Sequence, residues 1–159
     1  MTRITALIFS ITLTLAGITR ANEENSVATK VIPEPIQVVT NGTVTIAGKR
    51  VDYQATAGQL LMHNAEDQPI ALYGYTAYVK TDAGNNRPVV FAYNGGPGSA
   101  SMWLHMGILG PKRTVVDDPA FTTEGPFQYI NNEFSILDVA DLVMIDPVGT
   151  GYSRSVGEG

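Results

Sequence analysis

Between residues 37 and 81 the chain alternates β-favouring runs with turn-forming residues. Segments 37–48, 50–64 and 70–81 are rich in Val, Ile, Thr and Tyr, which favour strands. Asn41-Gly42 stands between two β-branched runs of the first segment, and both residue types tolerate the positive φ that a two-residue hairpin turn requires. The pattern therefore predicts an antiparallel β-meander with a hairpin turn at Asn41-Gly42.

Two later runs, at 89–94 and 140–146, are apolar almost without interruption. Such runs are typical of strands that are buried on both faces of a sheet. Each run leads into a glycine-rich turn, Asn-Gly-Gly-Pro-Gly at 94–98 and Pro-Val-Gly-Thr-Gly at 147–151. Ligands of open α/β sheets bind beyond the carboxyl ends of the strands. We therefore expect the two glycine-rich turns to line one site.

Residues 99–110 lie between these runs and predict a helix of about two and a half turns. Ser99 or Ser101 would be its N-cap, and Gly110-Pro111 would end it. A β-meander that continues into a β-α-β unit is typical of the first half of an α/β sheet. The fold class that we expect is therefore α/β.

The N-terminus has a different character from the rest of the chain. Arg3 precedes an uncharged, mostly apolar stretch at 4–18 that is too short to span a bilayer comfortably. This pattern indicates a cleaved secretory signal at residues 1–21, with a buried N-terminal helix as the alternative. A polar, proline-containing linker at 22–35 would then lead into one domain at 36–159. The protein would be secreted or periplasmic, without membrane contact after signal removal.

Composition excludes several function classes. A chain of 159 residues with 44% hydrophobic content is sized for a single globular domain. The formal net charge of -5 and the absence of any Lys/Arg cluster argue against a nucleic-acid partner. The chain has no cysteine, so its stability depends on its core rather than on disulfides.

The glycine-rich turns could serve phosphate binding or acyl transfer. Neither is followed by the Lys of a P-loop, and both lack the third glycine of a dinucleotide fingerprint, so we expect neither a cofactor nor a metal. An oxyanion hole fits better, because glycine lets a substrate carbonyl approach backbone N–H groups. In α/β-hydrolases one donor comes from a loop between a strand and a helix. Pro97 cannot donate, which leaves Gly95 or Gly96.

Three stretches together carry a family resemblance. They are NGGPGSAS at 94–101, GILGP at 107–111 and NNEFSILDVADLVMIDPVGTGYS at 131–153. From Arg87 onward the chain resembles the N-terminal portion of the serine carboxypeptidases, the S10 peptidases, which have the α/β-hydrolase fold.

This resemblance implies roles for the first glycine-rich turn. Gly96 would donate one oxyanion-hole N–H, and Asn94 and Gly95 would bind the C-terminal carboxylate of the substrate. Residues 146–153 would close the other side of the site. The substrate would be a peptide or protein with a free C-terminus, whose last peptide bond is hydrolysed through an acyl-enzyme.

Two positions depart from the family pattern. Ala92 stands where the family usually has Trp, and Ile108 stands where it usually has Glu. That Glu normally pairs with another carboxylic acid on the carboxylate-binding side. The resemblance therefore implies the fold more directly than a strict exopeptidase specificity.

A nucleophile elbow of the form Gly-x-Ser-x-Gly is absent from the sequence. In the α/β-hydrolase order the Ser, the acid and the His all follow the strand expected at 140–146. We therefore interpret the chain as an N-terminal fragment, truncated before the nucleophile elbow and catalytically silent by itself. The alternative is a short, non-catalytic binding or structural module derived from the same fold.

The remaining titratable candidates favour structural roles. His63 and His105 are the two histidines, and we expect both in structural or surface positions. Asp117, Asp118 and Asp138 are interpreted as turn and capping residues.

Export can be tested directly. If residues 1–21 are a cleaved signal, exported protein begins at Asn22, because the small Ala21 completes the site that signal peptidase recognises. N-terminal sequencing of secreted or periplasmic material measures this. Soluble cytoplasmic protein that retains Met1 would contradict the prediction.

Overall fold

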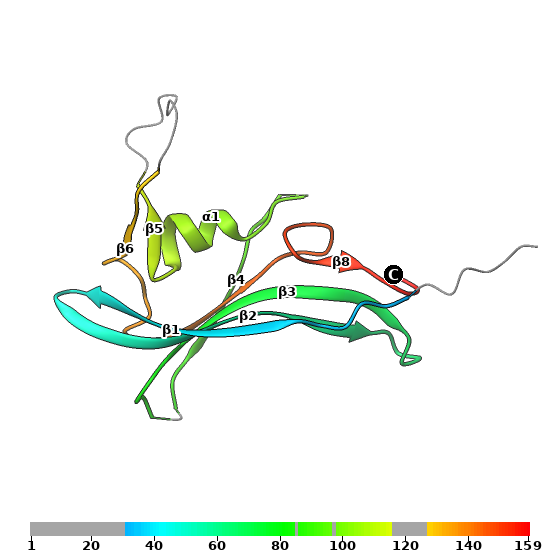
Figure 1. Cartoon of the computed structure of the whole chain (residues 1–159), viewed down its shortest axis with the longest axis horizontal. Helices are drawn as coiled ribbons and strands as arrows, with labels where there is room; N and C mark the ends of the chain where they lie inside the picture. Colours follow the sequence, from blue (N-terminus) through cyan, green and yellow to red (C-terminus); the bar gives the residue numbers. More distant parts are fainter. Residues whose placement is uncertain (1–30, 85, 97, 116–126) are drawn as a thin grey trace, which may run out of the picture.

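A computed structural model describes residues 31–84, 86–96, 98–115 and 127–159, so the expected signal segment at 1–21 lies outside the described residues. The main body is a six-stranded mixed sheet of order β1-β2-β3-β7-β4, in which β8 also pairs with β3 (Figure 1). A separate two-stranded sheet joins β5 and β6. The elements are β1 (Gln37–Ile46), β2 (Lys49–His63), β3 (Pro69–Lys80), β4 (Val89–Tyr93), α1 (Met102–Leu104), η1 (His105–Leu109), β5 (Lys112–Thr114), β6 (Tyr129–Asn131), β7 (Asp141–Ile145) and β8 (Arg154–Ser155).

The first hairpin turn lies elsewhere than the sequence predicts. Asn41 and Gly42 are in the middle of β1, and the chain turns at Ala47-Gly48, where φ is 47° and 76°. Gly42 lies directly opposite Tyr53 of β2, and a Cβ at Gly42 would be 2.5 Å from the Tyr53 ring. The hairpin prediction at Asn41-Gly42 was therefore wrong, because this glycine makes room for an aromatic ring from the neighbouring strand.

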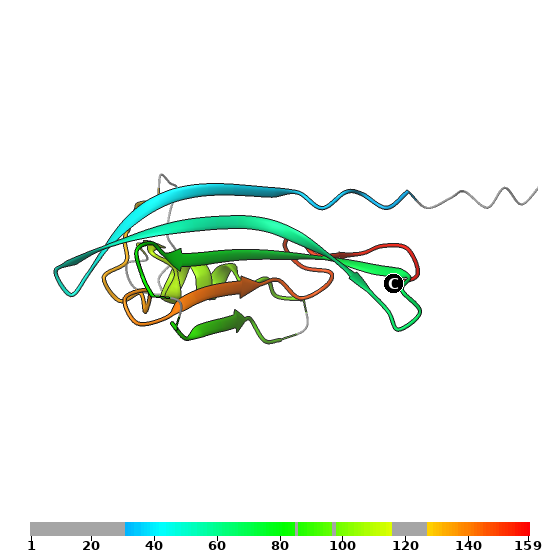
Figure 2. The same cartoon turned by 90° about the horizontal axis from the view of Figure 1, so that it is seen from below.

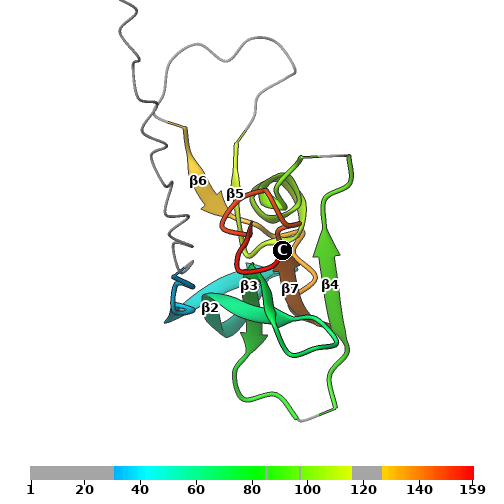
Figure 3. The same ribbon diagram turned by 90° about the vertical axis from the view of Figure 1, so that its right-hand side faces the viewer.

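The expected meander and β-α-β unit are both present. β1, β2 and β3 pair antiparallel in succession, and β3 then pairs antiparallel with β7. β4 pairs with β7 in parallel, and the crossover between them contains α1, η1, β5 and β6. Figure 2 shows the strands side by side in this order with β4 at the edge, and Figure 3 shows the helical segment on one face of the sheet.

The crossover helix ends where the sequence predicts, at Gly110 before Pro111. Its last turn is a π-helix, and its carbonyl groups are satisfied by two polar side chains. The fully buried Asn132 donates from Nδ2 to the carbonyls of Ile108 and Gly110, at 2.8 and 2.7 Å. The hydroxyl of Ser135 donates to the carbonyl of Leu109, which lies between them. These bonds fix the end of the helix, where intrahelical partners run out.

The two apolar strands are less buried than their composition predicts. β4 is the last strand of the sheet, and its Phe91 and Tyr93 are 62% and 68% exposed, whereas Ala92 is buried. In β7 the buried positions alternate, with Leu142 and Met144 inside. The expectation of burial on both faces was therefore wrong for β4, because none of the described elements covers its outer face.

The hydrophobic core lies between the crossover and the turn end of the β1–β2 hairpin. Strand residues from the meander meet β7 and the loop before it. The buried core residues are Val44, Ile46, Val51, Tyr53, Tyr78, Ala92, Leu137, Leu142 and Met144.

No helix within the described ranges is long and apolar enough to cross a membrane.

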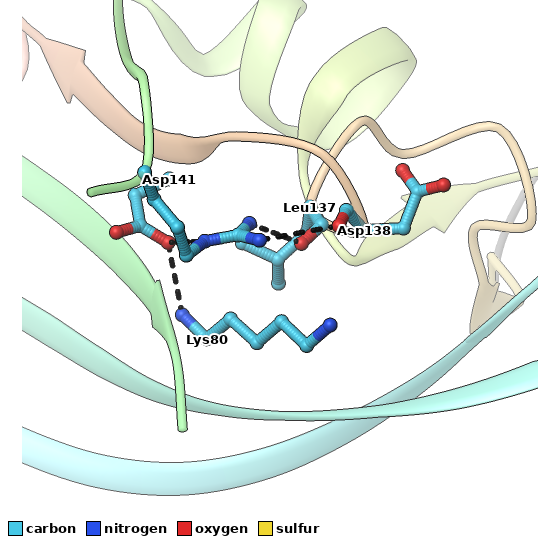
Figure 4. A network of polar contacts seen from close by, with 5 residues as sticks. Lys80, Leu137, Asp138 and Asp141 are labelled. Atoms are coloured by element: carbon cyan, nitrogen blue, oxygen red, sulfur yellow. Dashed lines mark hydrogen bonds and ion pairs between the residues drawn. The ribbon is translucent and has the colours of Figure 1, made fainter. Parts of the chain in front are cut away.

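A largely buried guanidinium, that of Arg87, joins the beginnings of the two parallel strands (Figure 4). Nε of Arg87, just before β4, lies 3.1 Å from Oδ1 of Asp141, the first residue of β7, and the two side chains are only 15% and 14% exposed. The same guanidinium donates to the carbonyls of Leu137 and Asp138, at 2.9 and 3.2 Å. The backbone N–H of Lys80 also donates to Asp141, at 3.1 Å, so three strands meet here. Asp138 lies in a turn, as expected, whereas Asp117 and Asp118 lie outside the described residues.

Loss of this guanidinium should destabilise the sheet. Arg87→Ala leaves a buried carboxylate and two carbonyls without their donor, so we expect the free energy of unfolding to fall by about 3–5 kcal/mol. The matched control is Arg50→Ala, which removes a surface ion pair with Asp52 whose side chains are 71% and 48% exposed. Exposed pairs contribute little. Equal losses for both variants in urea unfolding would contradict the prediction.

Candidate functional site

The first glycine-rich turn follows β4 and, together with the residues that lead into the helix, comprises 94–101; two serines brace it. The backbone N–H of Asn94 donates to Oγ of Ser101 at 3.3 Å, and Nδ2 of Asn94 donates to Oγ of Ser99 at 2.6 Å. Ser101 occupies the N-cap position of the helix, but its side chain makes no capping hydrogen bond. The two serines therefore hold the turn closed. A carboxamide has two N–H donors, so Asn94 retains one that could contact a ligand.

Inside this turn the backbone takes conformations that favour glycine. Gly96 and Gly98 have φ of 81° and 85°. Apart from the neighbouring residues, no described atom lies within 4 Å of the position that a Cβ would take at Gly95, Gly96 or Gly98. An approaching ligand would therefore meet backbone rather than side chains at these three residues.

The second glycine-rich turn, at 146–153, is compact. The N–H and hydroxyl of Thr150 both donate to the carbonyl of Pro147, at 3.0 and 2.8 Å. The N–H of Ser153 donates to the carbonyl of Thr150 at 2.9 Å, and the N–H of Gly149 donates to the carbonyl of Ser153 at 3.2 Å. These hydrogen bonds all lie within the turn, so they fix its backbone conformation.

Ser153 attaches the second turn to the sheet. Its buried Oγ donates to the carbonyl of Asp146 at 2.6 Å and accepts the N–H of Gly74 in β3 at 2.7 Å. Nε2 of Gln59 in β2 donates to the carbonyl of Tyr152 at 2.9 Å. A Cβ at Gly74 would lie 3.0 Å from Cβ of Tyr152, so this glycine allows the turn to approach the strand closely.

The two turns meet at Asp146, the residue that directly follows β7. Its Oδ1 accepts the N–H of Ser101 at 2.9 Å, and its Oδ2 accepts the N–H of Tyr152 at 3.4 Å. The hydroxyl of Ser101 also donates to the carbonyl of Ile145. The expectation that the two glycine-rich turns lie together is confirmed, because parallel pairing places the ends of β4 and β7 at the same edge.

Behind this junction lies a cavity of about 550 Å³ between the helix and the meander. Its walls are mostly apolar, with Val38 and Tyr75 from the sheet and Met102 and Met106 from the helical segment, and Asp146 is among the few polar groups. Volume and lining fall in the range of small-molecule pockets. The turn that contains Asp146 therefore borders both the sequence-predicted site and this cavity.

The half-buried His105 of η1 and the buried Tyr78 of β3 form a polar pair. Nε2 of His105 and Oη of Tyr78 lie 2.5 Å apart and share a hydrogen bond, while the ring of Tyr53 contacts Tyr78 edge-on. Burial lowers the pKa of His105, although the charge of Asp146 opposes this shift, and burial raises the pKa of Tyr78. Both rings are therefore neutral near pH 7, as expected of structural residues. His63, in contrast, is exposed at the end of β2.

The two residues that depart from the family pattern lie in different environments. Ala92, in β4, is buried in the core, and Ile108 is 57% exposed on η1. Within 31–84, 86–96, 98–115 and 127–159, no group of three or more His, Cys, Asp or Glu side chains could hold a metal ion. The sequence resemblance implies only that residues 146–153 close the other side of the site, and it gives the carboxylate of Asp146 no role of its own, whereas the structure places this carboxylate at the junction. An acidic residue directly after an apolar strand was the available signal.

The neutral state of His105 predicts a pH dependence of stability. Its pKa in the folded chain lies below the ordinary value of 6.5, so below that pH the unfolded chain binds a proton that the folded chain does not. The free energy of unfolding should therefore fall as the pH drops from about 7.5 to about 5.5, and His105→Gln should reduce this fall. Urea unfolding at both pH values measures it, with the exposed His63→Gln as control. An unchanged pH dependence in His105→Gln would contradict the prediction.

Comparison with known proteins identifies relatives of one kind. Residues 47–158 match the family model described as serine carboxypeptidase. The chain is 36% identical over 92 residues to serine carboxypeptidase-like 36 of Arabidopsis thaliana, covering 57% of this chain and 18% of that protein. It is 39% identical over 90 residues to pheromone-processing carboxypeptidase KEX1 of Cryptococcus gattii, covering 55% of this chain and 12% of that protein.

A solved structure of KEX1(delta)p, a prohormone-processing carboxypeptidase from Saccharomyces cerevisiae, matches with a TM-score of 0.47 and 28% identity, over 63% of this chain and 20% of that chain. The chain thus spans less than a fifth of the length of the curated relatives it matches. The resemblance inferred from the glycine-rich turns is confirmed by the family match over residues 47–158, and the chain belongs to the serine carboxypeptidase family.

Proposed function

We propose that this chain forms the oxyanion-donor and carboxylate-binding part of a serine-type carboxypeptidase with the α/β-hydrolase fold. Gly96 donates an N–H to the oxygen that becomes negative during acyl transfer, and Asn94 and Gly95 bind the C-terminal carboxylate of a peptide. The observation that carries the proposal is the open, braced turn at the end of β4. Its glycines present backbone to solvent, and its ends are held by Ser101 and Asn94.

The chemistry of acyl transfer supports the role of Gly96. A peptide carbonyl gains negative charge as it is attacked, and backbone N–H groups aimed at its oxygen stabilise that charge. Loss of one such donor typically lowers turnover by about 100- to 1,000-fold. A backbone donor works best when the protein holds it in place before the substrate arrives, and the braces on this turn would provide that.

Two functions compete for the side chain of Asn94. Its amide already donates to Ser99 at 2.6 Å, which supports a bracing role. Its second N–H leaves room for a bond to a carboxylate, which would be charge-assisted and therefore strong. We propose that Asn94 does both, with Ser99 orienting the amide for the ligand.

The catalytic triad is proposed to come from polypeptide outside these residues. The sequence has no Gly-x-Ser-x-Gly, and the relatives are several times longer than this chain. Export into a secreted or periplasmic compartment, as residues 1–21 predict, is part of the same proposal. The competing function is a non-catalytic binding or structural module derived from the same fold. A module of that kind has no need to distinguish a free C-terminus from a blocked one.

Binding of a free C-terminus tests the proposal on the chain itself. A blocked dipeptide with a free carboxyl group should shift the amide resonances of Asn94 and Gly95 in a saturable way. The same dipeptide as its C-terminal amide should bind at least about tenfold more weakly, because hydrogen bonds to a charged group contribute about 1.5–3 kcal/mol. Two-dimensional NMR titration of the ¹⁵N-labelled chain measures both. Equal affinities, or no shifts with either ligand, would contradict carboxylate recognition.

Two further variants separate binding from bracing. Asn94→Ala should weaken the free-acid dipeptide about tenfold or more, while Ser99→Ala, which removes the brace but keeps the amide, should have a smaller effect. Asn41→Ala, in the exposed middle of β1, is the control and should bind as the unmodified chain does. If Ser99→Ala weakens binding as much as Asn94→Ala, then Asn94 acts as a brace alone.

A further inference from the structure

The geometry points to Asp146 as a positioning residue that sets the shape of the first glycine-rich turn, and hence of the proposed oxyanion donor. What the turn binds rests on the proposed function, but the positioning itself does not. Asp146 lies outside the turn that it would control, directly after β7, the strand that neighbours β4 in the sheet. Its carboxylate lies between the two turns and accepts a backbone N–H from each, at Ser101 and Tyr152.

The main chain of Asp146 is itself fixed on the sheet. Its N–H donates to the carbonyl of Gly74 at 3.1 Å, and its carbonyl accepts the hydroxyl of Ser153 at 2.6 Å. A carboxylate only accepts hydrogen bonds, so it selects N–H or O–H groups and repels carbonyls. A charged acceptor also binds more strongly than a neutral one. Asp146 is therefore a charged acceptor that is held in a fixed place at the end of β7.

A short series of contacts leads from Asp146 to Gly96. The N–H of Ser101 binds the carboxylate, and the hydroxyl of the same serine accepts the N–H of Asn94 at 3.3 Å. Ser101 is 1% exposed and also donates to the carbonyl of Ile145, so it has little freedom to move independently. Asn94 and Ser101 are the two ends of the turn that contains Gly96. Displacement of the carboxylate should therefore displace the turn.

Gly151 provides independent support for a carboxylate held in one place. A Cβ at Gly151 would lie 2.0 Å from Oδ2 of Asp146 and 2.5 Å from its Cγ. Gly149, two residues earlier, also has positive φ, at 86° against 49°, but apart from its chain neighbours no described atom lies within 4 Å of its Cβ position. A side chain at either residue would strain the backbone because of the positive φ, whereas only a side chain at Gly151 would also collide with the carboxylate of Asp146. The pair is therefore a matched set for an experiment.

Removal of the charge tests the inference on the ¹⁵N-labelled chain. In Asp146→Asn we expect the Ser101 amide proton to shift upfield as it loses a charged acceptor, and the Asn94 and Gly96 resonances to move with it. Affinity for the free-acid dipeptide should fall about tenfold, the equivalent of one charge-assisted hydrogen bond. Asp138→Asn removes the same charge from an exposed turn and should leave all these signals unchanged.

Displacement of the carboxylate without loss of charge is the second arm. Gly151→Ala should reproduce the shifts at Ser101, Asn94 and Gly96, while Gly149→Ala should confine its effects to the second turn. The comparison of Gly151→Ala with Gly149→Ala still tests the inference if Asp146→Asn does not fold. The inference is overturned if Ser101 and Gly96 keep their resonances in Gly151→Ala, or if Gly149→Ala shifts them equally.

The two proposals fail in different ways. If the unmodified chain binds no dipeptide, but Asp146→Asn and Gly151→Ala shift the first turn as expected, then the proposed function fails and the positioning role stands. If the chain binds the free acid and Asp146→Asn changes neither affinity nor the Gly96 resonance, then the positioning role fails and the proposed function stands.

Discussion

The parallel pairing of β4 with β7 is the constraint on which the rest of the structure depends. It places the carboxyl ends of both strands at one edge, so two turns far apart in sequence become neighbours. β7 has an aspartate at its start and another directly after its end, and each accepts hydrogen bonds from the β4 side. Asp141 binds Arg87 before β4 begins, and Asp146 binds Ser101 after β4 ends. A five-residue edge strand has few ladder bonds of its own, so these two polar contacts fix its register and its approach to β7.

The glycines of the chain fall into two groups with different physical causes. Gly42, Gly74 and Gly151 are required by other parts of the protein, namely a Tyr53 ring, the backbone of Tyr152 and the carboxylate of Asp146. At Gly95, Gly96, Gly98 and Gly149, no described atom beyond the neighbouring residues approaches the Cβ position. Gly48, Gly84 and Gly107 are equally open, so openness by itself does not mark a site. Four of the open glycines nevertheless gather in the two turns that meet at the edge. Packing explains the first group. In the turn after β4, the open glycines fit the proposed approach of a ligand to the backbone.

Sequence patterns predicted the order of elements well, and their environment less well. The meander, the β-α-β unit and the end of the helix before Pro111 were all expected, because each depends on local preferences. The predicted turn at Asn41-Gly42 was wrong, because a glycine is needed at position 42 to make room for the ring of Tyr53 from the neighbouring strand β2. Ser101 was expected as a helix cap, but its hydroxyl binds the neighbouring strand and the start of its own turn. Burial of β4 on both faces was also wrong, because apolar composition does not say which faces are covered.

The sequence by itself determined the family, the two glycine-rich turns and the strands that precede them, because these depend on residue identity and spacing along the chain. Only the tertiary structure decided that Asp146 joins the turns, that Arg87 joins the beginnings of the strands, and that His105 pairs with Tyr78. These contacts link residues 27 to 54 positions apart. The direction in which such a side chain points is set by strand register and by the neighbours across the sheet. Neither quantity is local, so no short stretch of sequence contains it.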